Sequence, residues 1–185
     1  NDYGGAADYN QSFPHTVIDG NNALQLLSKD AVVYQQRLLL LWTDDDEVIV
    51  ASRVGLQNNF LQDRPLNSSC ALLFKSGSSG RAKVLRMADN DGLVVFTSIG
   101  VFLHTGELSP SNLALVKKGS WLINENVPPL TVPGGALFVD ASTNTIRQLG
   151  WSTEAAAYSG NELSTYSNHL FQSKEVVSWG FHEGD

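Results

Sequence analysis

Short apolar runs separated by turn residues are the feature that most limits how this chain can fold. Runs of three to seven residues recur along the 185 residues, and they are rich in Val, Leu, Phe and Trp. These lengths and residue types are typical of β-strands. The sequence therefore predicts an all-β fold, a small antiparallel β-barrel or β-sandwich. The predicted strands are Ala31–Tyr34, Arg37–Thr43, Glu47–Arg53, Ala71–Lys75, Ala82–Met87, Leu93–Thr97, Val101–His104, Trp121–Ile123, Ala136–Asp140, Thr145–Leu149 and Glu175–Trp179.

Turn residues with a defined backbone role stand between several of these runs. Asp91-Gly92 can supply the positive φ angles of a tight hairpin turn between its two flanking strands. Ser76–Gly80 is a flexible sequence that we expect to form a hairpin loop between Ala71–Lys75 and Ala82–Met87. Pro133-Gly134-Gly135 predicts a turn that starts the strand at Ala136.

The first 22 residues differ in composition from the rest of the chain. They are rich in Gly, Asn, Asp and Tyr without a sustained hydrophobic period, so we expect residues 1–22 to form an N-terminal arm or loop. The total length is near that of one domain, which predicts a single barrel or sandwich domain at 23–185. Helical spacing at Leu56–Gln62 and at Thr153–Tyr158 predicts one or two short helices.

The distribution of charge argues against nucleic-acid and membrane partners. The net charge is −7, and the densest positive stretch, Arg81–Arg86, is too short to follow a phosphate backbone. A helix that crosses a bilayer needs about 20 apolar residues. The longest strongly apolar stretch here, Leu38–Trp42, has five. We therefore expect no nucleic-acid binding and no membrane insertion.

No motif for catalysis, a metal or a cofactor is recognisable. Cys70 is the only cysteine, which excludes an intrachain disulfide and a cysteine-based zinc site. The acidic segments Asp44–Glu47 and Asp89–Gly92 lack the complete ligand spacing of a calcium loop. We expect no enzyme activity, no metal and no cofactor, although a fold can assemble a catalytic triad from distant residues. The histidines are scattered, at His15, His104, His169 and His182.

The tryptophans provide the best indication of a binding site. Trp42 lies in an apolar run and is predicted to be core, whereas Trp121, Trp151 and Trp179 are flanked by Ser or Gly. An exposed aromatic ring beside small polar residues can stack on a sugar ring, while core packing is the alternative for each tryptophan. The segment from Trp151 to His169 combines aromatic and hydrogen-bonding side chains, which suits an adaptable binding loop. The predicted ligand-binding residues are Trp151, Tyr158, Asn161, Tyr166 and His169.

A series of features in residues 37–151 occurs in a characteristic order. In that order they resemble the C-terminal part of the protruding domain of calicivirus capsid proteins, the noroviruses and their relatives. Each feature alone is generic, and the order carries the resemblance. The features are the strand Arg37–Thr43, the segment Leu56–Gln62 before Pro65, Ala71–Phe74, Gly80-Arg81, the strand Ala82–Met87, Asp91-Gly92, a late Val/Phe strand and Arg147-Gln148-Leu149.

The resemblance implies a small β-barrel on the virion surface that attaches to a host receptor or glycan and associates with a copy of itself. The family inserts a large outer subdomain that carries the receptor contacts, and only residues 1–36 precede the similar region here. No binding residue of the family can therefore be transferred to this sequence. Two alternatives remain open: a secreted, free-standing β-sandwich lectin or carbohydrate-binding module, and a hydrolase with dispersed catalytic residues.

Overall fold

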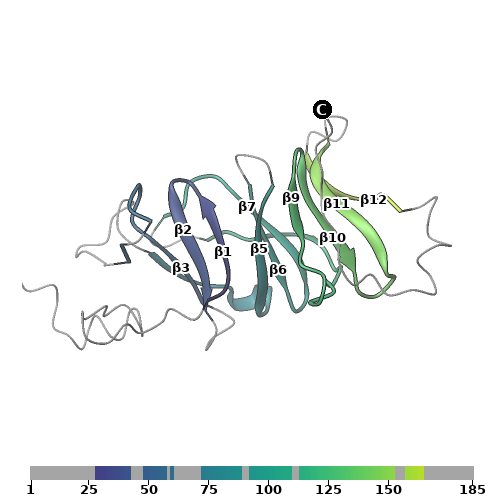
Figure 1. Ribbon diagram of the computed structural model, residues 1–185, viewed down its shortest axis with the longest axis horizontal. Helices are drawn as coiled ribbons and strands as arrows, with labels where there is room; N and C mark the ends of the chain where they lie inside the picture. Colours follow the sequence, from purple (N-terminus) through teal and green to yellow (C-terminus); the bar gives the residue numbers. More distant parts are fainter. Residues whose placement is uncertain are drawn as a thin grey trace, which may run out of the picture. The chain divides into compact units, whose positions relative to one another are not determined.

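The computed structural model describes residues 28–42, 48–57, 59–60, 72–88, 92–109, 113–152 and 157–164. These residues form two compact units. Unit 1 contains those from 1–78 and 107–113, and unit 2 contains those from 79–106 and 114–185. Their regular structure is three antiparallel sheets of four strands each and one short 3-10 helix, η1 (Gly77–Ser79) (Figure 1). The predicted all-β, antiparallel class is confirmed.

Unit 1 has one sheet with the strand order β1-β2-β3-β4. The β1–β2 turn is formed by Gln35 and Gln36, which both have positive φ angles, of 50° and 59°. Two successive positive φ angles are characteristic of a type I′ hairpin turn, which matches the twist of the flanking strands. The strands are β1 (Ser28–Tyr34), β2 (Arg37–Trp42), β3 (Val48–Ala51) and β4 (Leu72–Lys75).

Unit 2 has two sheets, with the strand orders β5-β6-β7-β8 and β12-β11-β10-β9. The first comprises β5 (Ala82–Ala88), β6 (Gly92–Thr97), β7 (Gly100–Thr105) and β8 (Val116–Gly119). The second comprises β9 (Leu130–Val132), β10 (Gly135–Asp140), β11 (Thr145–Ser152) and β12 (Ala157–Glu162). Apolar side chains of β6 and β7 join those of β10 and β11 in one core cluster, so the two sheets form a β-sandwich.

The apolar runs of the sequence also predict one common core, but its described residues divide between two clusters, so that prediction is wrong. The residues predicted to share it are Leu38, Leu40, Trp42, Val48, Val50, Leu73, Val84, Val94, Phe96 and Phe138. The hydrophobic pattern shows which residues are buried but not which sheet they pack against. The side chains of Trp42 and Leu73 lie outside the described part. Leu38, Leu40, Val48 and Val50 pack with Phe60 in unit 1. Val84, Val94, Phe96 and Phe138 belong to the core of unit 2.

The turn predicted at Pro133-Gly134-Gly135 connects β9 to β10. Gly134 and Gly135 have φ angles of +85° and +147°. A Cβ at Gly135 would lie 1.9 Å from the carbonyl oxygen of Leu149, on the neighbouring strand. The second glycine is therefore required for the close approach of two backbones as well as for the turn.

Ser76–Gly80 does not form the predicted hairpin loop. β4 pairs with β3 and β5 pairs with β6, so the segment connects two different sheets. Part of it is the short helix η1. The prediction was wrong because a flexible Gly/Ser sequence permits a hairpin and a crossover equally well. Asp91 lies outside the described residues, although β5 and β6 do pair as a hairpin requires.

The structure also corrects two predicted elements in unit 2. The helix expected at Thr153–Tyr158 is wrong at its end, because Tyr158 lies in β12 and pairs with Trp151 of β11. Pairing with an existing sheet outweighs the weak preference of one helical turn. The strand expected at Trp121–Ile123 is reduced to an isolated bridge between Ile123 and Asp140.

The remaining predictions of elements fall wholly or partly outside the described part. Residues 1–22 and Glu175–Trp179 lie outside it, as do three of the seven residues of Leu56–Gln62. The described residues of that last segment form a turn and a bridge between Arg53 and Leu56 rather than a helix. Within the described ranges, no helix has the length and apolar character to cross a membrane.

Candidate binding site

An aromatic pair lies at the end of the hairpin that β11 and β12 form. Trp151 and Tyr158 are directly opposite one another on these strands. Their ring centroids are 5.3 Å apart, and the ring planes meet at 80° in an edge-to-face arrangement. Tyr158 also packs against the core of unit 2, whereas Trp151 is 53% exposed. The core therefore holds the tyrosine ring, and the tyrosine positions an accessible indole.

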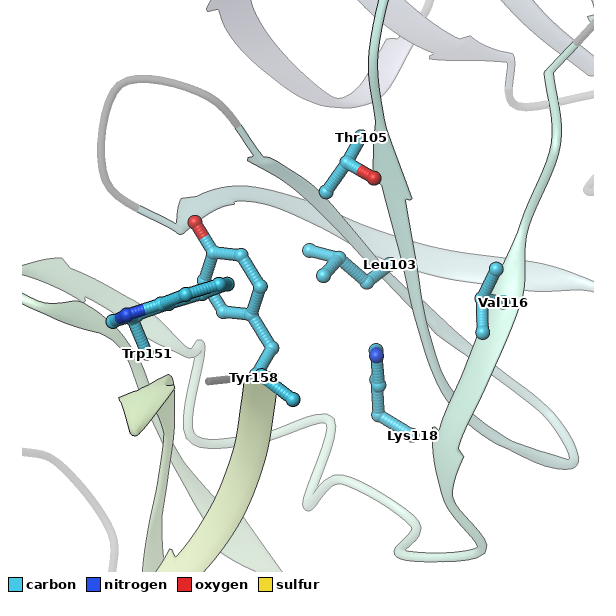
Figure 2. Close-up of a pocket in the computed structure, with 7 residues that line it drawn as sticks. Leu103, Thr105, Val116, Lys118, Trp151 and Tyr158 are labelled. Atoms are coloured by element: carbon cyan, nitrogen blue, oxygen red, sulfur yellow. The ribbon is translucent and has the colours of Figure 1, made fainter. Parts of the chain in front are cut away.

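A pocket of about 610 Å³ opens beside this pair, within unit 2. It lies between β7 and β8 of one sheet and β11 and β12 of the other. Its lining combines aromatic rings, aliphatic side chains, two hydroxyl groups and one ammonium group. Ligand sites are typically concave and mostly apolar with a few polar groups that fix orientation. The described lining residues are Leu103, Thr105, Val116, Lys118, Trp151, Ala157 and Tyr158 (Figure 2).

The pocket extends from the sandwich core to the solvent. Leu103 belongs to the core cluster and is only 2% exposed. Val116 is its cross-strand partner on β8 and is 56% exposed. This cross-strand pair thus has one residue in the buried core and one at the solvent-exposed edge of the pocket. A ligand there can bury an apolar face against the protein and keep its polar groups near water.

Lys118 lies two residues after Val116 on β8, so strand alternation places both side chains on the face that lines the pocket, and the pairing of β8 is irregular at this point. Phe102 pairs with Lys117, but Val101 pairs with Gly119. Lys118 is therefore the extra residue of a β-bulge. Bulges re-aim side chains and are frequent beside functional sites. Figure 2 shows the Lys118 side chain extending from β8 into the space between Tyr158 and Val116.

Trp121 is held in the sandwich by two glycines. A Cβ at Gly119 of β8 would lie 2.3 Å from the Trp121 ring, and a Cβ at Gly160 of β12 would lie 2.2 Å from it. The indole also lies 6.1 Å from the Phe138 ring, and the Arg147 guanidinium lies 5.3 Å from its centroid. Trp121 is thus a packing residue that fills the space between β8 and β12.

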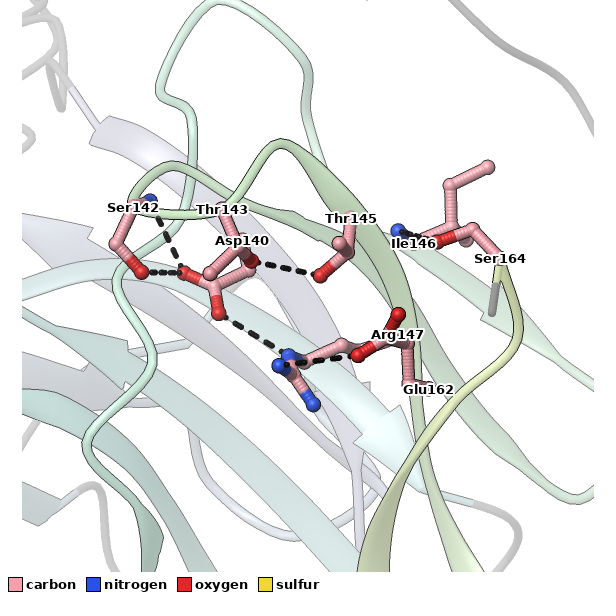
Figure 3. A network of polar contacts seen from close by, with 8 residues as sticks. All are labelled: Asp140, Ser142, Thr143, Thr145, Ile146, Arg147, Glu162 and Ser164. Atoms are coloured by element: carbon pink, nitrogen blue, oxygen red, sulfur yellow. Dashed lines mark hydrogen bonds and ion pairs between the residues drawn. The ribbon is translucent and has the colours of Figure 1, made fainter. Parts of the chain in front are cut away.

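A network of polar contacts fixes Arg147 over that tryptophan (Figure 3). Arg147 Nε donates to Asp140 Oδ2 at 3.0 Å, and Arg147 Nη2 lies 3.5 Å from Glu162 Oε2. The Ser142 hydroxyl and amide both donate to Asp140 Oδ1. Burial acts to raise the pKa of the Asp140 carboxyl, but hydrogen bonds from Ser142, Arg147 and Thr143 outweigh it and hold the pKa below its ordinary value of 3.8.

No protein-family model matches the chain, and no curated protein matches it. In the part of the chain that the structure describes, no group of three or more His, Cys, Asp or Glu side chains is placed to hold a metal ion.

The structure brings together two of the five predicted binding residues. Trp151 and Tyr158 both line the pocket. Asn161 lies on the same strand, β12, and pairs with Gln148. It is three residues from Tyr158, so it points to the opposite face of the sheet and is not among the described lining residues. Tyr166 and His169 lie outside the described residues.

Four lining residues were missed because they come from β7 and β8. The sequence signal for β8 is weak, since Val116–Gly119 contains two lysines and a glycine. Leu103 has a clear signal as a core residue, but its position beside Trp151 depends on how two sheets face each other. Only the alternation of Leu103 with Thr105 on β7 could have indicated that Thr105 shares the face of a core residue.

Proposed function

We propose that this chain binds a glycan receptor through the pocket beside Trp151 and Tyr158, and that it does so as a surface domain of a viral capsid. The observation that carries the binding proposal is the exposed indole of Trp151, fixed edge-to-face on Tyr158 over a pocket of about 610 Å³. Sugar rings stack on such aromatic faces through their apolar C–H surfaces. The chain acts by binding rather than by catalysis.

The hydroxyl groups of the pocket support a sugar over a purely apolar ligand. Thr105 and Tyr158 each present a group that can both donate and accept a hydrogen bond. A sugar offers hydroxyls of the same dual character around an apolar ring face. One stacked aromatic ring with a few hydroxyl contacts corresponds to a Kd of about 1 mM, or about 4 kcal/mol.

The capsid part of the proposal is supported by the resemblance of residues 37–151 to calicivirus protruding domains. An all-β, antiparallel fold is the class of fold that such a domain requires. On a virion surface, many copies and self-association would raise a millimolar affinity through avidity. The genomic sequence around this segment tests that part. An upstream jelly-roll shell domain supports it, whereas a neighbouring catalytic domain favours a carbohydrate-binding module.

The binding part is tested on a glycan array, with the wild-type protein and the Trp151→Ala variant each displayed in several copies on one carrier. We expect the wild-type protein to bind a restricted set of glycans and the variant to lose them all, with a melting temperature lowered by no more than about 4 °C. A matched control is Leu122→Ala, which removes an exposed apolar side chain of unit 2 that does not line the pocket. Equal glycan binding by wild type and Trp151→Ala, or no glycan bound by either, contradicts the proposal.

A further inference from the structure

The pocket beside Trp151 has one charge among its described lining residues, and that charge is positive. Lys118 supplies it, and the other six are neutral. The chain as a whole has a net charge of −7. A single ammonium group in an otherwise neutral pocket of an acidic protein is a local inversion of charge that favours an anionic ligand group.

The placement of Lys118 is specific to the strand geometry. It occupies the extra position of the β8 bulge, next to Lys117, which pairs regularly with Phe102. Lys117 is exposed and does not line the pocket. Two neighbouring lysines on one strand therefore differ in their relation to the site: Lys118 shares the face of Val116, which also lines the pocket, and Lys117 lies on the other face.

We propose that the ligand of this pocket is a carboxylate-bearing sugar, such as a uronic or a nonulosonic acid, with Lys118 as the contact of its carboxylate; this rests on the proposed function of the same site. The sugar ring stacks on Trp151, and the Tyr158 hydroxyl faces its ring hydroxyls. A flexible ammonium group with three donors suits a carboxylate whose exact position varies between sugars.

The expected contribution of this contact is about tenfold in affinity. Hydrogen bonds to charged groups are stronger than neutral ones, and the half-buried position of Lys118 reduces their screening by solvent. The contact is nevertheless sensitive to salt, because the pocket opens to solvent. The preference for an acidic sugar should therefore decrease as the ionic strength increases.

The test uses three ligands that differ only at one carbon: galacturonate, its methyl ester and galactose. Binding to the full chain is measured by NMR titration, together with N-acetylneuraminate as a second acid. We expect galacturonate to bind about ten times more tightly than the ester or galactose. Lys118→Gln should remove that difference by lowering the affinity for galacturonate, while Lys117→Gln should keep the difference.

The outcomes separate this inference from the proposed function. Equal affinities for the acid, the ester and galactose, all lost in Trp151→Ala, overturn the inference and leave the sugar site standing. An acid preference that survives Lys118→Gln also overturns it. Failure of every sugar to bind overturns both proposals. Loss of the acid preference in Lys118→Gln alone, with a normal spectrum of the folded variant, supports the inference.

Discussion

Trp121 and Trp151 have similar neighbours in the sequence and opposite surroundings in unit 2. Both adjoin serine or glycine, yet Trp121 is packed between Gly119 and Gly160. Trp151 instead meets Tyr158 on the opposite strand and remains 53% exposed at a pocket. The residue of β12 that each indole meets accounts for the difference: Gly160 for Trp121 and Tyr158 for Trp151. A glycine admits the indole into the sandwich, whereas a tyrosine occupies that space itself.

The comparison shows why local sequence could not identify the binding tryptophan by itself. Gly160 is 39 residues from Trp121 in the sequence and meets it only because β12 of one sheet lies against β8 of the other. Different experiments therefore distinguish a tryptophan that stabilises the fold from one that is available to a ligand. The first should affect the free energy of unfolding, and the second should affect binding.

The largest expected loss of stability is at Phe138, beneath Trp121. Phe138 is fully buried and meets Phe96 edge-to-face with a centroid distance of 5.2 Å. Phe138→Ala should lower the free energy of unfolding by about 3 to 5 kcal/mol in chemical denaturation. Leu137→Ala is the control, because Leu137 points to the other face of β10 and is only half-buried. Similar losses in the two variants would contradict the assignment of Phe138 to the core.

A substitution at Gly160 tests the packing of Trp121 directly. Valine normally favours strands, but its Cβ here would collide with the indole ring. Gly160→Val should therefore destabilise the protein by about 1 to 3 kcal/mol. Ser159→Val, on the opposite face of β12, should not. In a Trp121→Ala background the Gly160→Val cost should largely disappear, and strict additivity of the two changes would refute the contact.

Much of the strand pattern could be predicted, because many of the strands alternate or are wholly apolar. Arg37–Thr43, Ala82–Met87 and Ala136–Asp140 agree with β2, β5 and β10 to within one residue at either end. The missed strands, β8, β9 and β12, are edge strands of their sheets. These three strands are either very short or polar, so they form because a neighbouring strand offers hydrogen bonds rather than because of an apolar pattern of their own.

Only the part of the candidate site that lies on β11 and β12 was predicted from the sequence. Trp151 and Tyr158 were recognised because aromatic residues in a small, polar context are unusual for a core. Lys118 was not, since the polar sequence of Val116–Gly119 did not predict a strand, and only a strand places Lys118 and Lys117 on opposite faces. Thr105 and Val116 likewise join the pocket through the packing of two sheets, which a linear pattern of residues does not specify.

The polar network above Trp121 predicts a dependence of stability on pH. The folded state lowers the pKa of Asp140 below its unfolded value, so the stabilisation is complete above about pH 5 and is lost as the pH falls through about 4 and below. Asp140→Asn should cost about 2 kcal/mol at pH 7 and flatten the acid limb of the stability curve. Denaturation at a series of pH values measures this. An acid limb identical to that of wild type would contradict the role given to Asp140.

The smallest expected change in stability is at Trp151. Trp151→Ala removes an exposed ring and one edge-to-face contact, so its cost should be about 1 kcal/mol or less. Trp121→Ala should cost more, because it leaves a void between Gly119 and Gly160. Thermal melts of the two variants under the same conditions make the comparison. A larger loss at Trp151 than at Trp121 would reverse the roles assigned to the two residues.

The most direct test of the binding site follows the indole N–H signals in NMR spectra during titration with a bound glycan. Trp151→Phe and Trp121→Phe assign the two resonances. If the pocket binds the sugar, the Trp151 signal shifts progressively with glycan concentration and the Trp121 signal stays in place. A stationary Trp151 signal, with binding detected elsewhere or not at all, would contradict the central claim that this tryptophan forms the receptor site.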